Sequence, residues 1–179
     1  QLAQVSLFDF DIAEADDEAI IENESDGIVI GEIDPATGIV TVFAGDTAGD
    51  RQGIDRVVKG DANDENFRVR KVGGSDIDGR EAVQVTYWFI DDTHSRRSFS
   101  QTFQDASEVV IFAGSGNDEL IAEPSLSIAT KLEGGIGDDL VMGGGGSDWI
   151  VGGEGDDELY GFGGADRIDG GAGNDELFG

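Results

Sequence analysis

Residues 134–179 read GGIGDDLVM GGGGSDWIV GGEGDDELY GFGGADRID GGAGNDELF G when they are cut every nine residues. Each of these five blocks has glycine at its first and fourth positions, aspartate at its sixth and a branched aliphatic residue at its eighth, and four of the five have glycine at the second. A fixed period in which each position keeps its chemical role is the sequence signature of a solenoid. A flexible linker would not keep an aliphatic residue at every eighth position.

One block, residues 152–160, shows why these residue types recur at this spacing. Gly152, Gly153 and Gly155 permit a tight turn, because glycine enters the positive-φ region at little cost. Asp157 closes the turn with a carboxylate, and residues 158–160 follow as a short strand. Since side chains alternate faces along a strand, its central residue points away from its two neighbours. We therefore expect a thin apolar core made by the stacked eighth positions, which are Val141, Ile150, Leu159, Ile168 and Leu177.

The aspartates at the sixth positions favour a cation site. If each block is a half-coil, turns two blocks apart stack on the same edge, which puts Asp139, Asp157 and Asp175 on one edge and Asp148 and Asp166 on the other. Carboxylates and backbone carbonyls from neighbouring turns suit Ca²⁺ better than Mg²⁺, because Mg²⁺ demands a small octahedral site and keeps its waters. Zinc and copper are disfavoured, since the chain has no cysteine and a single histidine, His94.

With these residues the array resembles the RTX (repeats-in-toxin) family, whose hemolysin-type nonapeptide repeats form a calcium-binding β-roll. The resemblance implies an all-β, right-handed parallel β-roll in which the first six residues of each repeat bind calcium and the last three form a strand. Residues 113–121, AGSGNDELI, are a sixth repeat that begins at Ala113. The implied side-chain ligands are Asp118, Asp139, Asp148, Asp157, Asp166 and Asp175. The implied carbonyl ligands are Gly114, Gly116, Gly135, Gly137, Gly144, Gly146, Gly153, Gly155, Phe162, Gly164, Gly171 and Gly173, with Phe162 standing where the family has its second glycine. We expect about three to five calcium ions.

The spacing between the sixth repeat and the main array predicts how the first coils are built. Ala113 and Gly134 are 21 residues apart, which is one coil plus three residues. Residues 125–132 are therefore expected to fill a half-coil as a longer strand, with a loop bulging at Pro124. This arrangement stacks Asp118 on Asp139, so that these two carboxylates would share a cation in the same way as the regular blocks.

Upstream of the repeats, residues 27–112 form a strand-rich segment. Strands are expected at 27–32, 38–44, 54–59, 67–72, 82–90, 98–103 and 108–112. Turn residues at 34–38 suggest that the first two form either a hairpin or two successive strands. The segment either continues the solenoid as uneven coils or forms a small sandwich that caps it, since the end coils of a solenoid need capping. Residues 1–26 are acidic, and are either a solvated linker or a short strand at 8–12 followed by helical turns at 13–22. The expected organisation is thus an acidic segment 1–26, a strand-rich segment 27–112 and the roll 113–179.

Residues 60–72, GDANDENFRVRKV, allow two interpretations. An Asp- and Asn-rich linker similar to those of cadherin domains would bind calcium, but too few residues remain before the repeats for a cadherin fold. A degraded repeat turn, with Asp64 and Glu65 before Phe67, is the preferred interpretation, and residues 45–50 hold a similar turn. Because both turns contain less glycine, calcium ligation by Asp64 or Asp50 is expected less than at the regular turns.

The net charge of the chain excludes some classes of binding partner. It has 39 acidic and 11 basic residues and a formal net charge of −28 at pH 7. No nucleic-acid partner is expected, because phosphate binding needs a basic face, and an anionic membrane surface is disfavoured for the same reason. No run of apolar residues is long enough for membrane insertion. Such a charge destabilises a compact state by self-repulsion, so the composition itself points to a fold that depends on cations.

The motifs of common enzyme classes are missing. The chain contains no GxSxG, HExxH or P-loop motif, and His94 lies in a polar turn where a solvated side chain is expected. We therefore expect a binding module and not an enzyme. Trp149, Leu140 and Met142 occupy seventh and ninth positions, which face outward. They either mark an interface or are covered by residues 122–133 or the N-terminal part, and covering is the favoured expectation.

The biological setting follows from the resemblance alone. The chain begins at Gln1 without a signal peptide and stops at Gly179, the first residue of a further block, so we expect a fragment of a longer protein. The RTX resemblance implies a secreted or cell-surface bacterial protein that leaves the cell by type I secretion and folds in extracellular calcium. Two alternatives are an adhesin or matrix-interaction segment and the tail of a secreted hydrolase. An extracellular protein partner is possible under each, and the oligomeric state is open.

Overall fold

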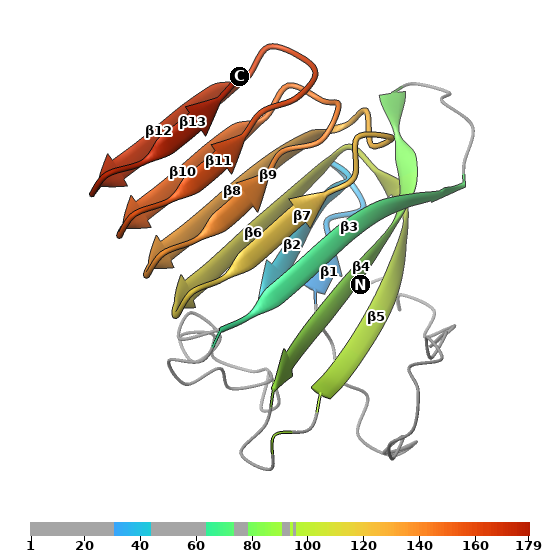
Figure 1. The fold of residues 1–179 in the computed structure, drawn as a ribbon. Coiled ribbons are helices and arrows are strands. Elements are labelled where there is room, and N and C mark those ends of the chain that lie inside the picture. Colours follow the sequence, from blue (N-terminus) through green and yellow to red (C-terminus); the bar gives the residue numbers. More distant parts are fainter. Residues whose placement is uncertain (1–30, 44–63, 74–78, 91–93, 95) are drawn as a thin grey trace.

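The fold is taken from a computed structural model, which describes residues 31–43, 64–73, 79–90, 94 and 96–179. These residues contain thirteen strands in two sheets of six and seven strands (Figure 1), and none of them forms a helix that could cross a membrane. Several expected features lie outside the described residues: the acidic segment 1–26, the turn at 45–50 with Asp50, and the strand at 54–59.

The first sheet has the order β1–β2–β6–β8–β10–β12 and the second the order β13–β11–β9–β7–β3–β4–β5. The strands of the first sheet are β1 (Gly31–Ile33), β2 (Ile39–Phe43), β6 (Glu108–Ser115), β8 (Ala129–Ile136), β10 (Trp149–Glu154) and β12 (Arg167–Ala172). Those of the second are β3 (Asn66–Gly73), β4 (Glu81–Ile90), β5 (Arg96–Ala106), β7 (Glu119–Ala122), β9 (Leu140–Met142), β11 (Glu158–Tyr160) and β13 (Glu176–Phe178).

From β6 to β13 the chain is a parallel β-roll. Successive strands alternate between the two sheets, and each strand pairs in parallel with the strand one coil later. The regular coils are 18 residues long, since Ile150 pairs with Ile168 and Leu159 with Leu177. The all-β fold and the parallel roll predicted from the nonapeptides are therefore confirmed.

The eighth positions form the core of the roll, as predicted. Val141, Ile150 and Leu159 are 0% exposed, and each stacks on the eighth-position residue of the neighbouring coils. A three-residue strand gains little on its own, so this column and the parallel pairing stabilise each coil through its neighbours. Leu177, in the last coil of the column, is 46% exposed.

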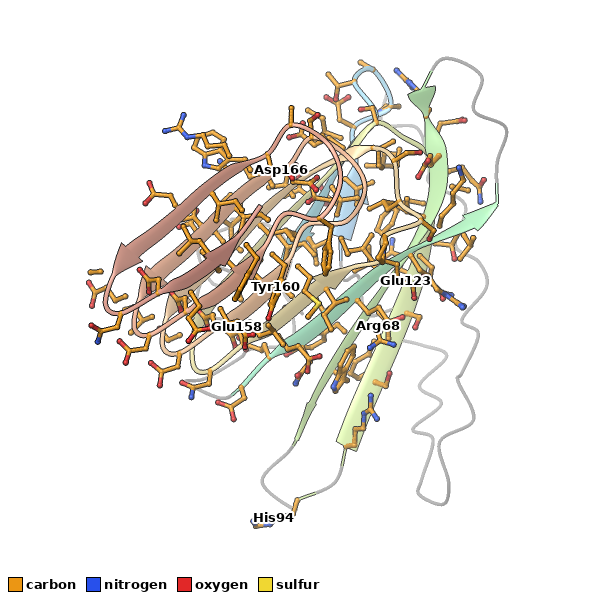
Figure 2. All side chains as sticks on the ribbon, turned by 45° about the horizontal axis from the view of Figure 1, so that its top comes forward. Arg68, His94, Glu123, Glu158, Tyr160 and Asp166 are labelled. Atoms are coloured by element: carbon orange, nitrogen blue, oxygen red, sulfur yellow. The ribbon has the colours of Figure 1, made fainter. Side chains whose placement is uncertain are left out.

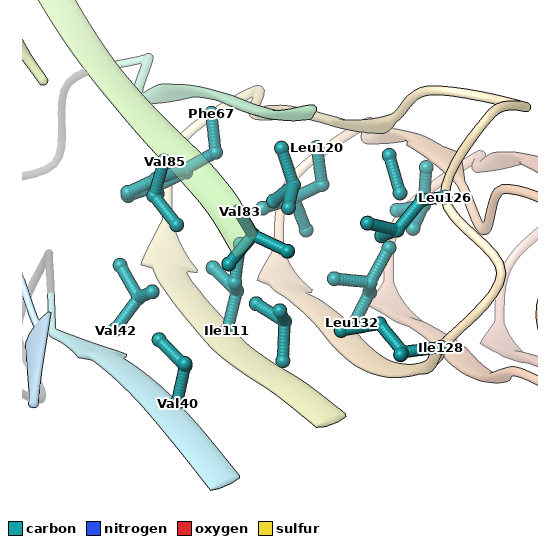
Figure 3. Packing of buried hydrophobic residues seen from close by; sticks show 14 of the residues in the cluster. Val40, Val42, Phe67, Val83, Val85, Ile111, Leu120, Leu126, Ile128 and Leu132 are labelled. Atoms are coloured by element: carbon teal, nitrogen blue, oxygen red, sulfur yellow. The ribbon is translucent and has the colours of Figure 1, made fainter. Parts of the chain in front are cut away.

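The strand-rich segment both continues the solenoid and caps it. β2 pairs in parallel with β6, and β3 pairs in parallel with β7, so each sheet gains one further strand in the register of the coils. Beyond them the pairing becomes antiparallel: β1 closes a hairpin with β2, and β4 and β5 follow β3. Val83 and Val85 of β4 enter the same apolar cluster as Val42 and Ile111 (Figure 3). The antiparallel strands thus cover the end of the apolar column.

The half-coil before the main array differs from the expectation. The strand predicted at 125–132 begins only at Ala129, as β8, and residues 123–128 form a loop that buries Leu126 and Ile128. The buried carboxylate of Glu81 anchors this loop: it accepts the Ser127 N–H at 3.3 Å and the Ser127 hydroxyl, and pairs with Lys71 at 2.9 Å. An inward-turned loop satisfies Glu81 and fills the core together, which a straight strand would not do. The domain boundary predicted between residues 112 and 113 falls inside β6.

Candidate metal site

The turns of the roll stack along two edges. The first edge carries the turns 113–118, 134–139, 152–157 and 170–175, and the second edge the turns 125–130, 143–148 and 161–166. The sixth residues of the first edge are Asp118, Asp139, Asp157 and Asp175, and those of the second edge are Thr130, Asp148 and Asp166 (Asp166 is labelled in Figure 2). We call these two series the first column and the second column. Asp118 stacks on Asp139 as the 21-residue spacing predicted, because β7 pairs with β9.

One hydrogen bond repeats along both columns. The backbone N–H of each sixth residue donates to Oδ1 of the aspartate one coil later. The N···O distances are 2.8 Å from Asp118 to Asp139, 2.9 Å from Asp139 to Asp157, 3.1 Å from Asp157 to Asp175 and 2.9 Å from Asp148 to Asp166. One oxygen of each accepting carboxylate is therefore held by the backbone of the preceding coil.

The second oxygen of these carboxylates has no such partner. The Oδ2 atoms of Asp118, Asp139, Asp148 and Asp157 are buried without a hydrogen-bond partner, and each of these residues is only 2% exposed. Buried polar groups in native proteins almost always have a partner, and an unpaired charged group is the most costly exception. Four such oxygens at equivalent positions indicate a ligand that the columns are built to hold.

Burial dominates the electrostatics of the columns. It raises the pKa of Asp139 from the usual 3.8 to about 7, and those of Asp118 and Asp148 to about 6. The pKa of Asp157 is raised for the same reason. Hydrogen bonds from the preceding coil oppose these shifts, whereas nearby aspartates reinforce them. Without a cation, the columns therefore make the charged form of these carboxyls less favourable than it is in water.

Glycine is required in these turns because the coils approach very closely. A Cβ on Gly152 would lie 2.2 Å from Oδ2 of Asp157, so the carboxylate rests against the first glycine of its own turn. A Cβ on Gly153 would lie 2.0 Å from the carbonyl oxygen of Gly135, which points along the stack at the next coil. The carbonyls of one turn therefore face the following turn across a gap that admits no side chain.

The predicted carbonyl residues all lie in these turns. They are Gly114, Gly116, Gly135, Gly137, Gly153, Gly155, Gly171 and Gly173 on the first edge, and Gly144, Gly146, Phe162 and Gly164 on the second. Phe162 takes φ +64°, in the positive region that Gly144 occupies one coil earlier at +111°. Its ring is 50% exposed and stacks on Tyr160 at a centroid distance of 5.6 Å. The substitution thus keeps the turn at the cost of a strained backbone, typically about 1–2 kcal/mol.

An additional turn joins the first column at residues 64–65. The N–H of Glu65 donates to Oδ1 of Asp118 at 2.7 Å, and the Glu65 carbonyl accepts from Glu119 at 2.9 Å, as at every later coil. Glu65 is therefore the sixth residue of this turn, and Asp64 is the fifth. The sequence pattern points to Asp64, less strongly than to the aspartates of the regular turns, as the carboxylate of this turn that could bind calcium. The structure places Glu65, one residue later, at the position that the aspartates occupy in the other turns. Phe67, as the eighth-position residue, was the signal that would have fixed it.

The oxygen set fits calcium. Among the described residues no three carboxylate or imidazole side chains converge on one point, so a cation between two turns would take much of its coordination from carbonyls. Calcium accepts six to eight oxygens in flexible geometry, including carboxylates and backbone carbonyls. His94 is exposed at the tip of the loop between β4 and β5, away from Asp166 (Figure 2). Three observations agree with calcium: the oxygen donors, the unpaired Oδ2 atoms, and the glycine turns whose carbonyls face the next coil.

The expected covering of Trp149 is wrong. Its side chain is 43% exposed on the outer face of the first sheet. Lys131 and Arg167 lie over its ring at 4.7 and 5.1 Å from the centroid, so cation–π contacts along neighbouring coils hold it in place. Leu140 and Met142, on the second sheet, are half-buried.

Comparison with known families agrees with this geometry. The model of the RTX calcium-binding nonapeptide repeat matches residues 131–150 and 142–177, in four copies. Neither the curated proteins nor the solved structures gave a match. The matched residues are the coils that carry both columns from β8 to β13. Residues 131–177 are therefore similar to the RTX calcium-binding nonapeptide repeat, the family that the sequence resembles.

Proposed function

We propose that this chain is the calcium-binding β-roll module of a larger secreted or cell-surface bacterial protein, and that it folds when it binds calcium outside the cell. The observation that carries the proposal is the series of four buried, unpaired Oδ2 atoms in the two columns. Three of the four, in Asp118, Asp139 and Asp157, lie in consecutive coils of the first edge, where a cation between two neighbouring coils would neutralise both carboxylates.

The proposed side-chain ligands are the aspartates of the two columns, Asp118, Asp139, Asp157, Asp175, Asp148 and Asp166. Adjacent members of a column would share an ion, and carbonyls of the second and fourth residues of each turn would complete its coordination. Calcium would supply the positive charge that offsets the stacked carboxylates. The chain itself supplies the rest: the N–H of the preceding coil orients each carboxylate, and the glycines let the coils approach.

Folding is expected to depend on the ion for two reasons. The net charge of −28 and the stacked aspartates repel one another in any compact state. In addition, β9, β11 and β13 have only three residues each, so a single coil buries too little apolar area to offset the entropy of ordering its chain. Binding energy then becomes folding energy. Extracellular calcium modules typically bind at about 10⁻⁴–10⁻³ M, which would leave the chain unfolded inside the cell.

A calcium titration followed by far-UV circular dichroism tests the proposal, with magnesium as the control. We expect a cooperative gain of β-sheet signal with calcium alone, at sub-millimolar to millimolar concentrations. A full β-sheet signal in metal-free buffer that calcium does not change would contradict metal-coupled folding. Isothermal titration calorimetry in parallel would then show whether calcium binds a roll that is already folded, which separates binding from folding.

A second candidate is display of an adhesive surface, and one observation favours it. Tyr160 stacks on Phe178 at a centroid distance of 4.6 Å and on Phe162 at 5.6 Å, which gives the roll an aromatic row whose two outer members are exposed and whose central Tyr160 is half-buried. Beads coated with the calcium-loaded module should then bind alkyl or cellulose surfaces, and the Tyr160→Ser/Phe178→Ser double variant should lose this binding while keeping its calcium response. Equal binding by the variant would exclude the row as the adhesive surface.

A further inference from the structure

The second column changes its chemistry at one position. Thr130 occupies the sixth position of the half-coil 125–133, where the later turns of this edge have Asp148 and Asp166. Thr130 is 1% exposed, and its N–H donates to Oδ1 of Asp148 at 2.7 Å, as the aspartates do elsewhere. The backbone of the column therefore continues through this coil, while its carboxylate is replaced by a hydroxyl group.

The hydroxyl group lies between two acceptors. Oγ1 of Thr130 is 3.0 Å from Oδ1 of Asp148 and 3.1 Å from the carbonyl oxygen of Gly143. A hydroxyl donates a single proton, so it serves one of these oxygens at a time. Its side chain supplies a donor to the gap between the two turns, where the side chains of two ionised aspartates offer acceptors only.

The second- and fourth-residue carbonyls of the turn 125–130 take the same positions as those of the turn 143–148. The carbonyl of Leu126 accepts from Gly145 at 2.9 Å, as the carbonyl of Gly144 accepts from Gly163 at 3.2 Å one coil later. The fourth-residue carbonyls correspond in the same way: those of Ile128 and Gly146 lie 2.1 and 1.7 Å from where a Cβ would stand on the fourth glycine of the next turn. Among the groups that face the gap, the side chain at position 130 is thus the main difference between this gap and the next.

We propose that Thr130 closes the second column to calcium. The gap between Thr130 and Asp148 is held by hydrogen bonds of the hydroxyl group, so this edge takes calcium between Asp148 and Asp166 but not one coil earlier. One carboxylate with an oxygen already bonded to Thr130 offers too little negative charge for a divalent ion in a buried gap. The first column has aspartates from Asp118 onward, so the two edges load unequally. This inference rests on the proposed calcium function.

The test compares wild type with Thr130→Asp, Thr130→Ser and Thr130→Val by calcium stoichiometry, using equilibrium dialysis or calorimetry with calcium chloride alone. Thr130→Asp restores the aspartate and should add about one bound ion. Thr130→Ser keeps the hydroxyl group and should match wild type in stoichiometry and in the melting temperature of the loaded form. Thr130→Val should keep the wild-type stoichiometry but melt at a lower temperature, because Gly143 and Asp148 lose a donor.

The outcomes separate this inference from the proposed function. An unchanged ion count in a folded Thr130→Asp variant, beside a wild type that binds calcium, would overturn the closing role of Thr130 alone. A lost ion in Thr130→Val would overturn it too, because the threonine would then belong to a site. If Thr130→Asp fails to fold, the serine and valine pair still decides the question. A wild type that binds no calcium would overturn the proposed function and this inference with it.

Discussion

The metal-free and calcium-loaded forms of the module should respond to acid in opposite directions. In metal-free buffer, lowering the pH from about 7 to about 5 should stabilise the fold, because the buried aspartates of the columns take up protons that the unfolded chain does not. In calcium, the same change should destabilise it, because protons compete with the ion for the carboxylates. The two pH profiles should therefore cross.

The sign follows from where the pKa values lie. In the folded, metal-free state the pKa of Asp139 is about 7 and those of Asp118 and Asp148 are about 6, against 3.8 for an exposed aspartate. Between these limits the native state holds more protons than the unfolded state, so stability falls as the pH rises through that window. A tenfold change in an acid dissociation constant corresponds to about 1.4 kcal/mol. If solvent screening leaves about a third of the stabilisation that these shifts imply, the three carboxyls together contribute roughly 3 kcal/mol once all are protonated, and about half of that is gained between pH 7 and pH 5.

Circular dichroism measures the effect, in buffers cleared of metal with a chelating resin, since soluble chelators weaken in acid. The β-sheet signal before heating gives the folded fraction at each pH, and thermal melting gives the stability of that folded fraction. Between pH 7 and pH 5 the expected rise in melting temperature is roughly 3–6 °C for a domain of this size. Asp139→Asn removes the group with the highest pKa and should flatten the metal-free profile. Asp169→Asn removes one charge from the exposed outer face of β12 and should leave the profile unchanged, which controls for net charge.

Greater stability at pH 8 than at pH 5 without calcium would refute this reasoning. So would a metal-free profile that Asp139→Asn and Asp169→Asn flatten equally, because the effect would then come from overall charge and not from the buried column.

Three further predictions address the ligands, the turns and the core. Asp157→Ala should remove one or two of the bound calcium ions in a calorimetric titration, since Asp157 lies between two gaps of its column. An unchanged number of bound ions would contradict its assignment as a shared ligand. Gly155→Ala should destabilise the loaded form by about 2 kcal/mol or more in calcium-containing denaturant, because φ is +137° and a Cβ would lie 2.1 Å from a carbonyl oxygen of the preceding turn. Gly163→Ala, whose Cβ would have 3.6 Å to its nearest atom, should stay within about 0.5 kcal/mol of wild type, and equal losses would contradict the close-approach argument. Leu159→Ala should cost about 2–5 kcal/mol by the same assay, whereas Leu177→Ala, in the same column but 46% exposed, should cost far less; a reversed order would show that the core lies elsewhere.

Regular repeats were predicted from the sequence because their contacts are with copies of themselves. The apolar eighth positions and the sixth-position aspartates each recur every nine residues, so stacking them required only the length of a coil. The irregular coils could not be predicted in this way, because their residues do not follow the nonapeptide pattern. Val109 and Thr130 take the sixth position in register with Asp148 and Asp166, but neither residue carries a signal of that role. The loop at 123–128 likewise depends on Glu81, far away in the sequence.

The nonapeptides alone predict a roll with two acidic edges over residues 113–179, because a short repeat encodes both the strand and the turn of every coil. How that roll ends cannot be derived from the repeats and is seen only in the folded chain. The pairing of β2 with β6 and of β3 with β7 extends both sheets, and it brings Glu65 to the head of the first column. These strand pairings join segments that share no repeat. Their register is fixed by the burial of one apolar core, and the residues of that core lie far apart in the chain.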